Sequence, residues 1–133
     1  MMPPNLQVTV LDNIPSLLEF EELVTNQSLI AFDSEGVDLS RIGELTLMSF
    51  GVELQNGDVH VFLLDPIQQD LNVRRKTLEV AKHILQSTEI IKIIHDCRQD
   101  SDALYRVTQP CIKLRNVFDT QVWDYLANRS LRR

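Results

Sequence analysis

The first half of the chain alternates short apolar segments with polar turn residues, a pattern typical of strands. Residues 7–11 predict a strand or an extended segment, and three more strands are predicted at residues 28–33, 44–54 and 58–65. Asn56 and Gly57 separate the last two, and this pair is a strong signal for a tight hairpin turn. After residue 11, apolar residues recur with helical spacing from Pro15, which suits a first helical turn, to about Thr25.

The second half of the chain changes to longer segments with helical spacing. Four elements follow from this pattern: a helix at 71–87, a strand at 90–94, a helix at 95–108 and a strand at 112–118. Asp119 or Thr120 then suits the cap of a last helix. The chain therefore places three strands joined by short turns before strands that are separated by helices.

This order predicts the type of sheet. Strands joined by short turns pair antiparallel, whereas helical crossovers connect parallel strands. We expect an α/β fold with a mixed five-stranded sheet, in which an antiparallel three-stranded meander precedes parallel strands, with flanking helices. A length of 133 residues suits one domain, so residues 1–27 would add a strand and a helix to the domain formed by residues 28–133.

Charge limits the partners that the chain can bind. The net charge is −6, which argues against a large basic face for nucleic acid but not against an acidic site that holds phosphates through metal ions. Two basic clusters could follow a phosphate backbone: Arg74, Arg75 and Lys76, and Arg129, Arg132 and Arg133. A solvated helix face and a chain terminus explain these clusters more simply.

Other features bear on the compartment. No apolar run approaches the roughly 20 residues that span a bilayer, so no membrane partner is expected. The first ten residues lack the pattern of a signal peptide. Cys97 and Cys111 lack metal-binding spacing, which suits reduced thiols in an intracellular protein. The sequence does not distinguish the cytoplasm from the nucleus.

Asp33 and Glu35 follow the apolar run of residues 29–32. Residues two apart in a strand point to the same face, so the two carboxylates would lie together and repel each other unless a cation lies between them. Mg²⁺ prefers such oxygen ligands, and Gly36 would let the backbone turn or a ligand approach closely. Two solvated acids at a strand end remain the simpler interpretation of this pair alone.

A second acidic cluster follows the strand predicted at residues 90–94. It contains His95, Asp96, Asp100 and Asp102. Ligand sites in α/β sheets tend to lie at the carboxyl ends of strands. Asp96 and Asp102 are also explained by the preference for acids in the first turn of a helix, where they complement the helix dipole.

Four segments in order resemble the ribonuclease D-like branch of the DEDD 3′–5′ exonucleases. They are "IAFDSEGVDLSRIGELTLMSFGV", "VFLLDP", "IIKIIHDCRQDSDALYRV" and "VFDTQVWDYL", within residues 28–126. The chain is similar to 3′–5′ exonuclease domain-containing proteins and to relatives of Egalitarian. The resemblance implies a ribonuclease H-like fold and metal-dependent hydrolysis at the 3′ end of single-stranded RNA or DNA.

The resemblance also assigns roles to individual residues. It implies that Asp33 and Glu35 form the first motif and that Asp100, five residues after the landmark His95, forms the second. A complete site would hold two Mg²⁺ or Mn²⁺ ions. Asp33 would bridge them, Glu35 would bind one ion and orient the attacking water, and Asp100 would anchor the other. Asp119, in "FDTQ", fits a helix cap better than a metal ligand.

The third motif of the family, a Tyr or His four residues before an Asp, is missing. No Tyr or His of this sequence has an Asp four residues later, and the sequence ends at Arg133. We expect that the fourth ligand and the general base are absent, with Asp124 able to substitute only if its helix faces the site. The chain could be a fragment, a naturally short protein, or one completed by a homodimer or a protein partner that covers the missing end.

Three functions remain open at this point. The first, which we take as the main hypothesis, is a 3′–5′ exonuclease that is inactive alone if the missing motif is essential. The second is a catalytically inactive nucleic-acid-binding or protein-interaction scaffold of the same fold. The third is an α/β domain whose acids only cap helices and face solvent.

Overall fold

The computed structural model describes residues 5–37, 43–108 and 111–131, so Arg132 and Arg133 of the second basic cluster lie outside the described residues. Its elements are β1 (Leu6–Leu11), α1 (Ile14–Thr25), β2 (Leu29–Val37), β3 (Glu44–Glu53), β4 (Val59–Leu64), α2 (Leu71–Leu85), β5 (Ile91–Ile94), α3 (Cys97–Val107), β6 (Val117–Asp119) and α4 (Thr120–Leu131). Among the described residues, no helix is long and apolar enough to cross a bilayer.

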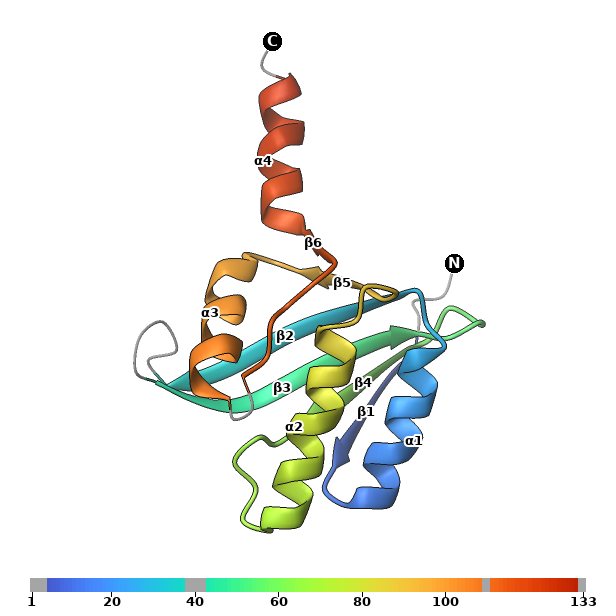
Figure 1. The fold of residues 1–133 in the computed structure, drawn as a ribbon. Coiled ribbons are helices and arrows are strands. Elements are labelled where there is room, and N and C mark those ends of the chain that lie inside the picture. Colours follow the sequence, from blue (N-terminus) through green and yellow to red (C-terminus); the bar gives the residue numbers. More distant parts are fainter. Residues whose placement is uncertain (1–4, 38–42, 109–110, 132–133) are drawn as a thin grey trace.

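The strands form one mixed sheet in the order β1-β4-β3-β2-β5-β6 (Figure 1). β2, β3 and β4 form the predicted antiparallel meander. β5 pairs in parallel with β2, and β6 pairs in parallel with β5. The prediction of a mixed sheet is confirmed, but the expected number of five strands is wrong, because the described residues alone form a sheet of six. The sixth is β1, which pairs in parallel with β4 along its whole length.

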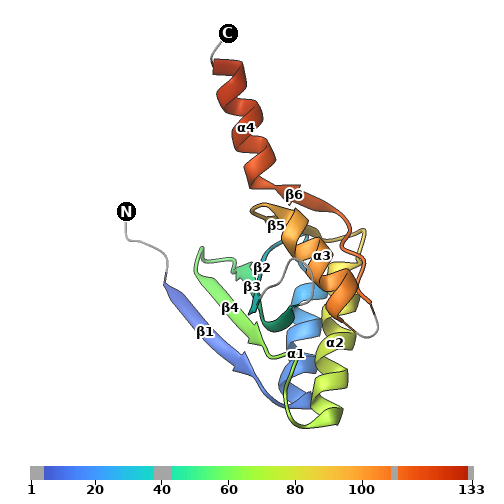
Figure 2. The ribbon, with the colours of Figure 1, turned by 90° about the vertical axis from the view of Figure 1, so that its left-hand side faces the viewer.

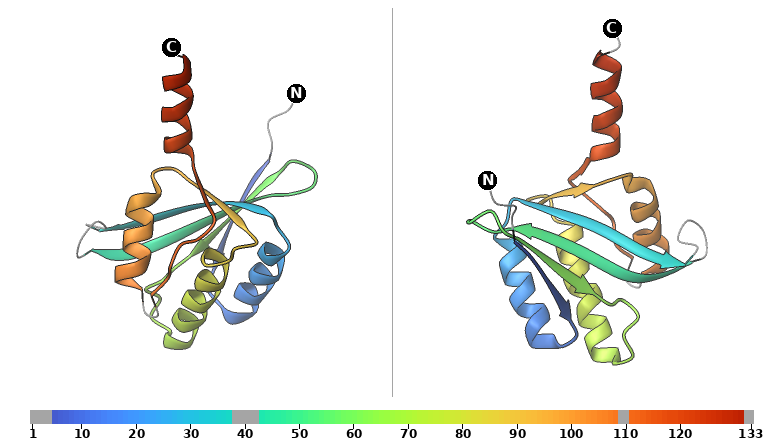
Figure 3. Two further views of the ribbon diagram at one scale, coloured as in Figure 1. Left: turned by 45° about the horizontal axis from the view of Figure 1, so that its top comes forward. Right: turned by 180° about the vertical axis from the view of Figure 1, so that it is seen from behind.

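One face of the sheet carries α1, α2 and α3, and the opposite face has no described helix over it (Figures 2 and 3). The alternation along β2 agrees with this arrangement. Ile30, Phe32 and Ser34 are buried, whereas Ala31 and Asp33 are exposed. The core therefore lies between the sheet and the three helices.

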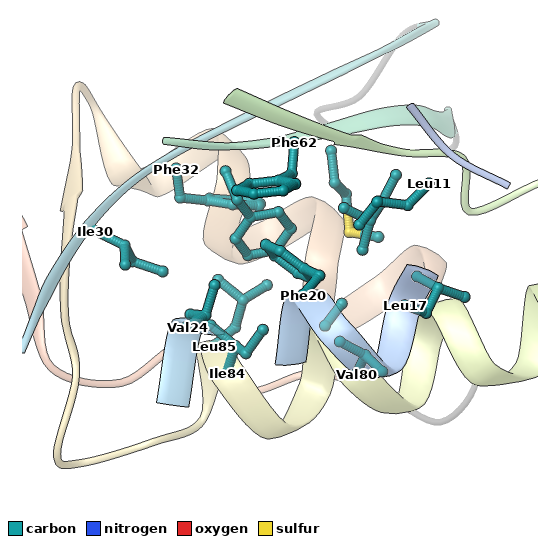
Figure 4. Packing of buried hydrophobic residues seen from close by; sticks show 14 of the residues in the cluster. Leu11, Leu17, Phe20, Val24, Ile30, Phe32, Phe62, Val80, Ile84 and Leu85 are labelled. Carbon is teal, nitrogen blue, oxygen red and sulfur yellow. The ribbon is translucent and has the colours of Figure 1, made fainter. Parts of the chain in front are cut away.

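Phe20 of α1 lies at the centre of this core (Figure 4). Its ring centroid is 5.3 Å from that of Phe50 and 4.8 Å from that of Phe62. Phe32 extends the cluster, 4.9 Å from Phe50. These edge and tilted arrangements are the ones that aromatic rings prefer. The aromatic cluster holds α1 against the three strands of the meander.

Local signals explain where the helices begin. Asn13 caps α1 by accepting a hydrogen bond from the Ser16 N–H, and Pro15 lies in the first turn as predicted. Asp70 caps α2 by accepting bonds from the N–H groups of Asn72 and Val73. The helices at residues 14–25 and 71–85 are thus close to those that the spacing predicts.

The strand predicted at residues 112–118 is shorter than expected. Only Val117–Asp119 pairs with β5. The preceding segment crosses the helices instead, since the Ile112 N–H donates to the Leu104 carbonyl and the Arg115 N–H to the Leu85 carbonyl. Asn116 then takes a left-handed conformation, with a φ of 56°, where the chain turns into β6.

Lys92 is fully buried on β5, and its burial makes the free energy of unfolding change with pH in the alkaline range. Its Nζ donates to the Ser87 carbonyl at 2.6 Å, and burial lowers its pKa to about 8. Between pH 8 and 10.5 the unfolded chain binds more protons than the folded one, so stability rises with pH. Between pH 7.5 and 10 the free energy of unfolding of the wild-type protein should rise by about 2 kcal/mol more than that of the Lys92→Met variant. Urea unfolding of both proteins at the two pH values measures this difference. An equal rise in both proteins would contradict this explanation.

Candidate active site

Asp33 and Glu35 lie within β2 and not at its end, because the strand continues to Val37. Both side chains are exposed on the face of the sheet that the described helices leave open, as the two-residue periodicity predicts. Asp33 pairs across the sheet with Ser49, and Glu35 pairs with Leu47. The register shifts between Glu35 and Gly36, which places an irregularity directly after the second acid.

Asp100 lies in the first turn of α3 and is only 6% exposed. Ser34, the residue between the two strand acids, holds it: its N–H donates to Asp100 Oδ1 at 3.1 Å, and its hydroxyl donates to the same oxygen. Burial raises the pKa of Asp100, the bonds from Ser34 oppose this effect, and the negative charge of Asp33 adds to it. Ser34 thus ties Asp100 to β2, whereas the side chains of Asp33 and Glu35 point to the opposite face of that strand.

Asp119 connects the start of α3 to the start of α4. Its Oδ1 accepts bonds from the N–H groups of Asp96 (3.0 Å) and Gln121 (2.9 Å), and its Oδ2 accepts one from the Cys97 N–H (2.9 Å). These bonds, led by that of the Cys97 N–H, hold the pKa of Asp119 well below its usual range. Both carboxylate oxygens therefore serve as helix caps, the role that the sequence favoured for this residue.

His95 and Asp96 also form bonds at this junction between the start of α3 and the start of α4. His95 Nδ1 and Thr120 Oγ1 share a hydrogen bond of 2.9 Å, and Asp96 forms an ion pair with Arg98 at 3.2 Å. Burial, followed by the nearby Asp119, raises the pKa of the Cys97 thiol to about 11. This shift disfavours the thiolate, which is the nucleophilic form of cysteine.

Asp124 lies on α4, which extends away from the edge of the sheet (Figure 1). Its side chain is exposed. Within the described residues Asp124 joins no group of three or more potential metal-binding side chains, so the structure does not bring it to the other acids as a substitute ligand.

The acids fit a divalent cation in their chemistry but not in their arrangement. Carboxylate oxygens are the ligands that Mg²⁺ and Mn²⁺ prefer, and Asp33 and Glu35 share one face of β2. Nevertheless, within the described residues no group of three or more His, Cys, Asp or Glu side chains comes together to hold a metal ion. Asp33, Glu35 and Asp100 therefore do not form a complete metal centre by themselves.

The sequence did not identify Ser34 as a functional residue. The residue lies between two acids on a strand, and strand periodicity places it on the buried side. A buried hydroxyl needs a partner, so this position gave a signal that it would bond to a polar group of the core. The identity of that group, Asp100, depends on how α3 packs and was not available from local pattern.

The fold and the acids identify the class of protein. Residues 8–131 match the 3′–5′ exonuclease domain family, and the chain belongs to that family. Among curated proteins it is 34% identical over 99 residues to the piRNA biogenesis protein EXD1 of Xenopus laevis, with 74% of this chain and 20% of the relative covered. It is 34% identical over 103 residues to EXD1 of Mus musculus, with 77% and 16% covered. The chain thus spans about a fifth of the length of these relatives.

Solved structures agree with this family. The RNase D of Trypanosoma brucei in complex with RNA U12 is 25% identical, with a TM-score of 0.69, and the match covers 90% of this chain and 39% of that one. The Nibbler EXO domain of Aedes aegypti, at 17% identity, has a TM-score of 0.74 and supports the fold alone, over 92% of this chain and 57% of that one. The mixed α/β fold is that of RNase D-like exonucleases.

Proposed function

We propose that this chain is a nuclease domain that removes nucleotides from the 3′ end of single-stranded nucleic acid. The observation that carries the proposal is that Ser34, the residue between Asp33 and Glu35 on β2, binds the buried Asp100 of α3, in a chain of the 3′–5′ exonuclease family. Burial of the Asp100 carboxyl makes it harder to ionise, and a purely structural role gives no reason for an acid at this position.

The acids define the group that would assist the reaction. Asp33 and Glu35, which share one face of β2, would contribute carboxylates to a bound Mg²⁺ or Mn²⁺, and such an ion would supply positive charge for the phosphate and lower the pKa of a bound water. Asp100 bonds to Ser34, whose side chain points to the other face of β2, so the structure does not bring Asp100 together with these two acids. The open face of β2, on which Asp33 and Glu35 are exposed, would admit the strand.

RNA is the first substrate to test. The related RNase D of Trypanosoma brucei is solved in complex with RNA U12, and the related EXD1 proteins are named for piRNA biogenesis. Both observations concern other proteins, and they favour single-stranded RNA over DNA for this chain.

A second candidate function is a non-catalytic RNA-binding scaffold. The observation that favours it is that no group of three metal-binding side chains comes together in the part of the chain that the structure describes. In addition, His95 and Asp119 are occupied by bonds within the junction of α3 and α4. A scaffold would bind the strand without shortening it.

Cleavage of end-labelled RNA tests the first function against the second. We expect a 5′-labelled single-stranded RNA to shorten progressively from its 3′ end with Mn²⁺ and not with EDTA. Replacing Asp33 with Asn and Glu35 with Gln together should lower the rate at least about 100-fold, since both carboxylates would act in the transition state. Matched single-stranded DNA measures the preference between the two nucleic acids.

Asp102→Asn is the matched control for this experiment. Asp102 is an acid of the same helix as Asp100, but it forms an exposed ion pair with Arg106, so its loss should leave the rate unchanged. Intact RNA at high protein concentration would exclude the nuclease. If the wild-type protein then binds the RNA, measured by fluorescence anisotropy, the scaffold is the correct function.

A further inference from the structure

The hydroxyl of Ser34 holds Asp100 toward the buried side of β2. Ser34 is 9% exposed and belongs to the face of the strand that the helices cover. Asp33 and Glu35, on either side of it in sequence, are exposed on the open face. The bond from the hydroxyl therefore draws the Asp100 carboxylate to the side of the strand that these two acids do not use.

The backbone of Ser34 holds Asp100 at the edge of the same strand. β5 pairs with β2 only as far as Ala31, which lies opposite Ile93, so within the described residues β5 gives the Ser34 N–H no partner. Asp100 Oδ1 accepts this N–H at 3.1 Å instead. The N–H belongs to the peptide bond that follows Asp33, so Asp100 lies beside the backbone that carries the first exposed acid. The backbone bond alone leaves the carboxylate at the strand edge, and the hydroxyl bond directs it to the buried face.

Electrostatics favours keeping the three carboxylates apart unless a cation lies between them. Asp33 and Glu35 place two negative charges on one face, and a third carboxylate beside them would add to the repulsion. On the buried side Asp100 has two hydrogen-bond donors instead. A divalent cation at the open face would reverse this balance, because it attracts further carboxylate oxygens. The contact with Ser34 thus explains why the three acids do not come together in the described part of the chain.

We propose that the Ser34 hydroxyl is a latch, which holds Asp100 on the buried side of β2 and restrains it from joining Asp33 and Glu35 around a divalent cation. The proposal rests on the proposed nuclease function, because it concerns the acids of that site. Ser34 acts through Asp100 and is therefore a positioning residue. When the arrangement that binds a ligand is only partly populated, the affinity falls by that fraction. The latch thus lowers the affinity for the ion, and loss of the hydroxyl raises it.

Calorimetric titration with Mn²⁺ measures the effect of the latch. We expect the Ser34→Ala variant to bind Mn²⁺ about 5- to 20-fold more tightly than the wild-type protein, since a hydrogen bond to a carboxylate no longer has to break. Ser34→Cys, whose thiol is a weak donor, should lie between the two. Equal affinities would show that the hydroxyl does not restrain Asp100, and weaker binding by Ser34→Ala would show that it orients Asp100 toward the ion. Either result would overturn the proposal.

The gain in affinity must depend on Asp100. In a protein that already carries Asp100→Asn, the Ser34→Ala change should alter the Mn²⁺ affinity by less than about 2-fold, because the side chain that the latch holds no longer supplies a negative charge. Ser34→Thr keeps the hydroxyl and should bind Mn²⁺ as the wild-type protein does. A gain of the same size with and without the Asp100 carboxylate would mean that Ser34→Ala acts by loosening the strand, and the latch would be wrong.

Thr77→Val is the matched control for the loss of a buried hydroxyl. Thr77 is 1% exposed and donates to the Val73 carbonyl within α2, which carries none of the three acids, so this change should leave the Mn²⁺ affinity unaltered. Circular dichroism confirms that each variant is folded. Absence of Mn²⁺ binding by every variant, Ser34→Ala included, would overturn the latch together with the nuclease. RNA cleavage by a wild-type protein whose Mn²⁺ affinity Ser34→Ala does not change would overturn the latch alone.

Discussion

Replacing Phe20 with alanine is expected to lower the free energy of unfolding by about 3–5 kcal/mol. Phe20 is 1% exposed, and its ring contacts those of Phe50 and Phe62 at the centre of the core. The change removes the whole ring and leaves a cavity between α1 and the meander, where strands paired on both sides cannot collapse into the space. Since domains of this size are stable by about 5–15 kcal/mol, this loss is a large fraction of the total.

Urea unfolding at neutral pH, followed by circular dichroism, measures the effect. Leu18→Ala is the matched control, because it lies on the same helix but is 46% exposed, and its cost should stay below about 1 kcal/mol. Phe20→Leu should fall between the two, since it keeps part of the buried volume. A loss below 1 kcal/mol for Phe20→Ala would show that α1 does not depend on this ring for its position.

Periodicity predicted most elements because their signals are local. The helix at residues 14–25 follows from Asn13, Pro15 and the spacing of Leu17, Phe20 and Val24, all within a few turns. The hairpin between β3 and β4 follows from Asn56 and Gly57, and Gly57 takes the positive φ, 88°, that such turns need. These signals concern neighbours in sequence, so a single chain shows them directly.

The pairing of β1 could not be predicted in the same way. Residues 7–11 alternate as a strand, but whether a strand joins a sheet at an edge depends on a partner, here Val59–Leu64, that lies about fifty residues later. Likewise, residues 112–116 alternate as a strand and yet bond to α2 and α3. Alternation shows which residues of a segment share a face, but it does not show which groups the backbone of that segment will bond to.

The same difference between local signals and contacts of distant residues applies to the candidate site. That Asp33 and Glu35 share a face followed from strand geometry, and the family resemblance added Asp100. The bond between Ser34 and Asp100 joins residues 66 apart in sequence, and it depends on the position of the first turn of α3. Asp119 binds the backbone N–H groups at the start of α3. The position of Asp100 therefore depends on Asp119, a residue for which the sequence predicted only the role of a helix cap.

Asp119→Ala is expected to destabilise the protein by about 2–3 kcal/mol and to disturb the site as well. The change leaves three backbone N–H groups, those of Asp96, Cys97 and Gln121, without their acceptor, and a lost helix cap alone costs about 0.5–2 kcal/mol. Urea unfolding measures the loss. Hydrogen exchange should become faster at the amides of Asp96 and Cys97, and unchanged exchange there would show that water replaces the carboxylate.

The pH dependence of this variant separates capping from other effects of the side chain. Since the backbone N–H bonds hold the pKa of Asp119 below its ordinary 3.8, the stabilisation is complete above that value and is lost as the pH falls through the lower folded-state pKa. The difference in stability between wild type and Asp119→Ala should therefore be full at pH 7 and shrink in acid. Asp119→Asn keeps one acceptor oxygen but loses the charge, so it should recover part of the stability at pH 7. A cost that stays constant down to the acid limit would mean that Asp119 contributes through packing, and the start of α3, with Asp100 on it, would then be held by other contacts.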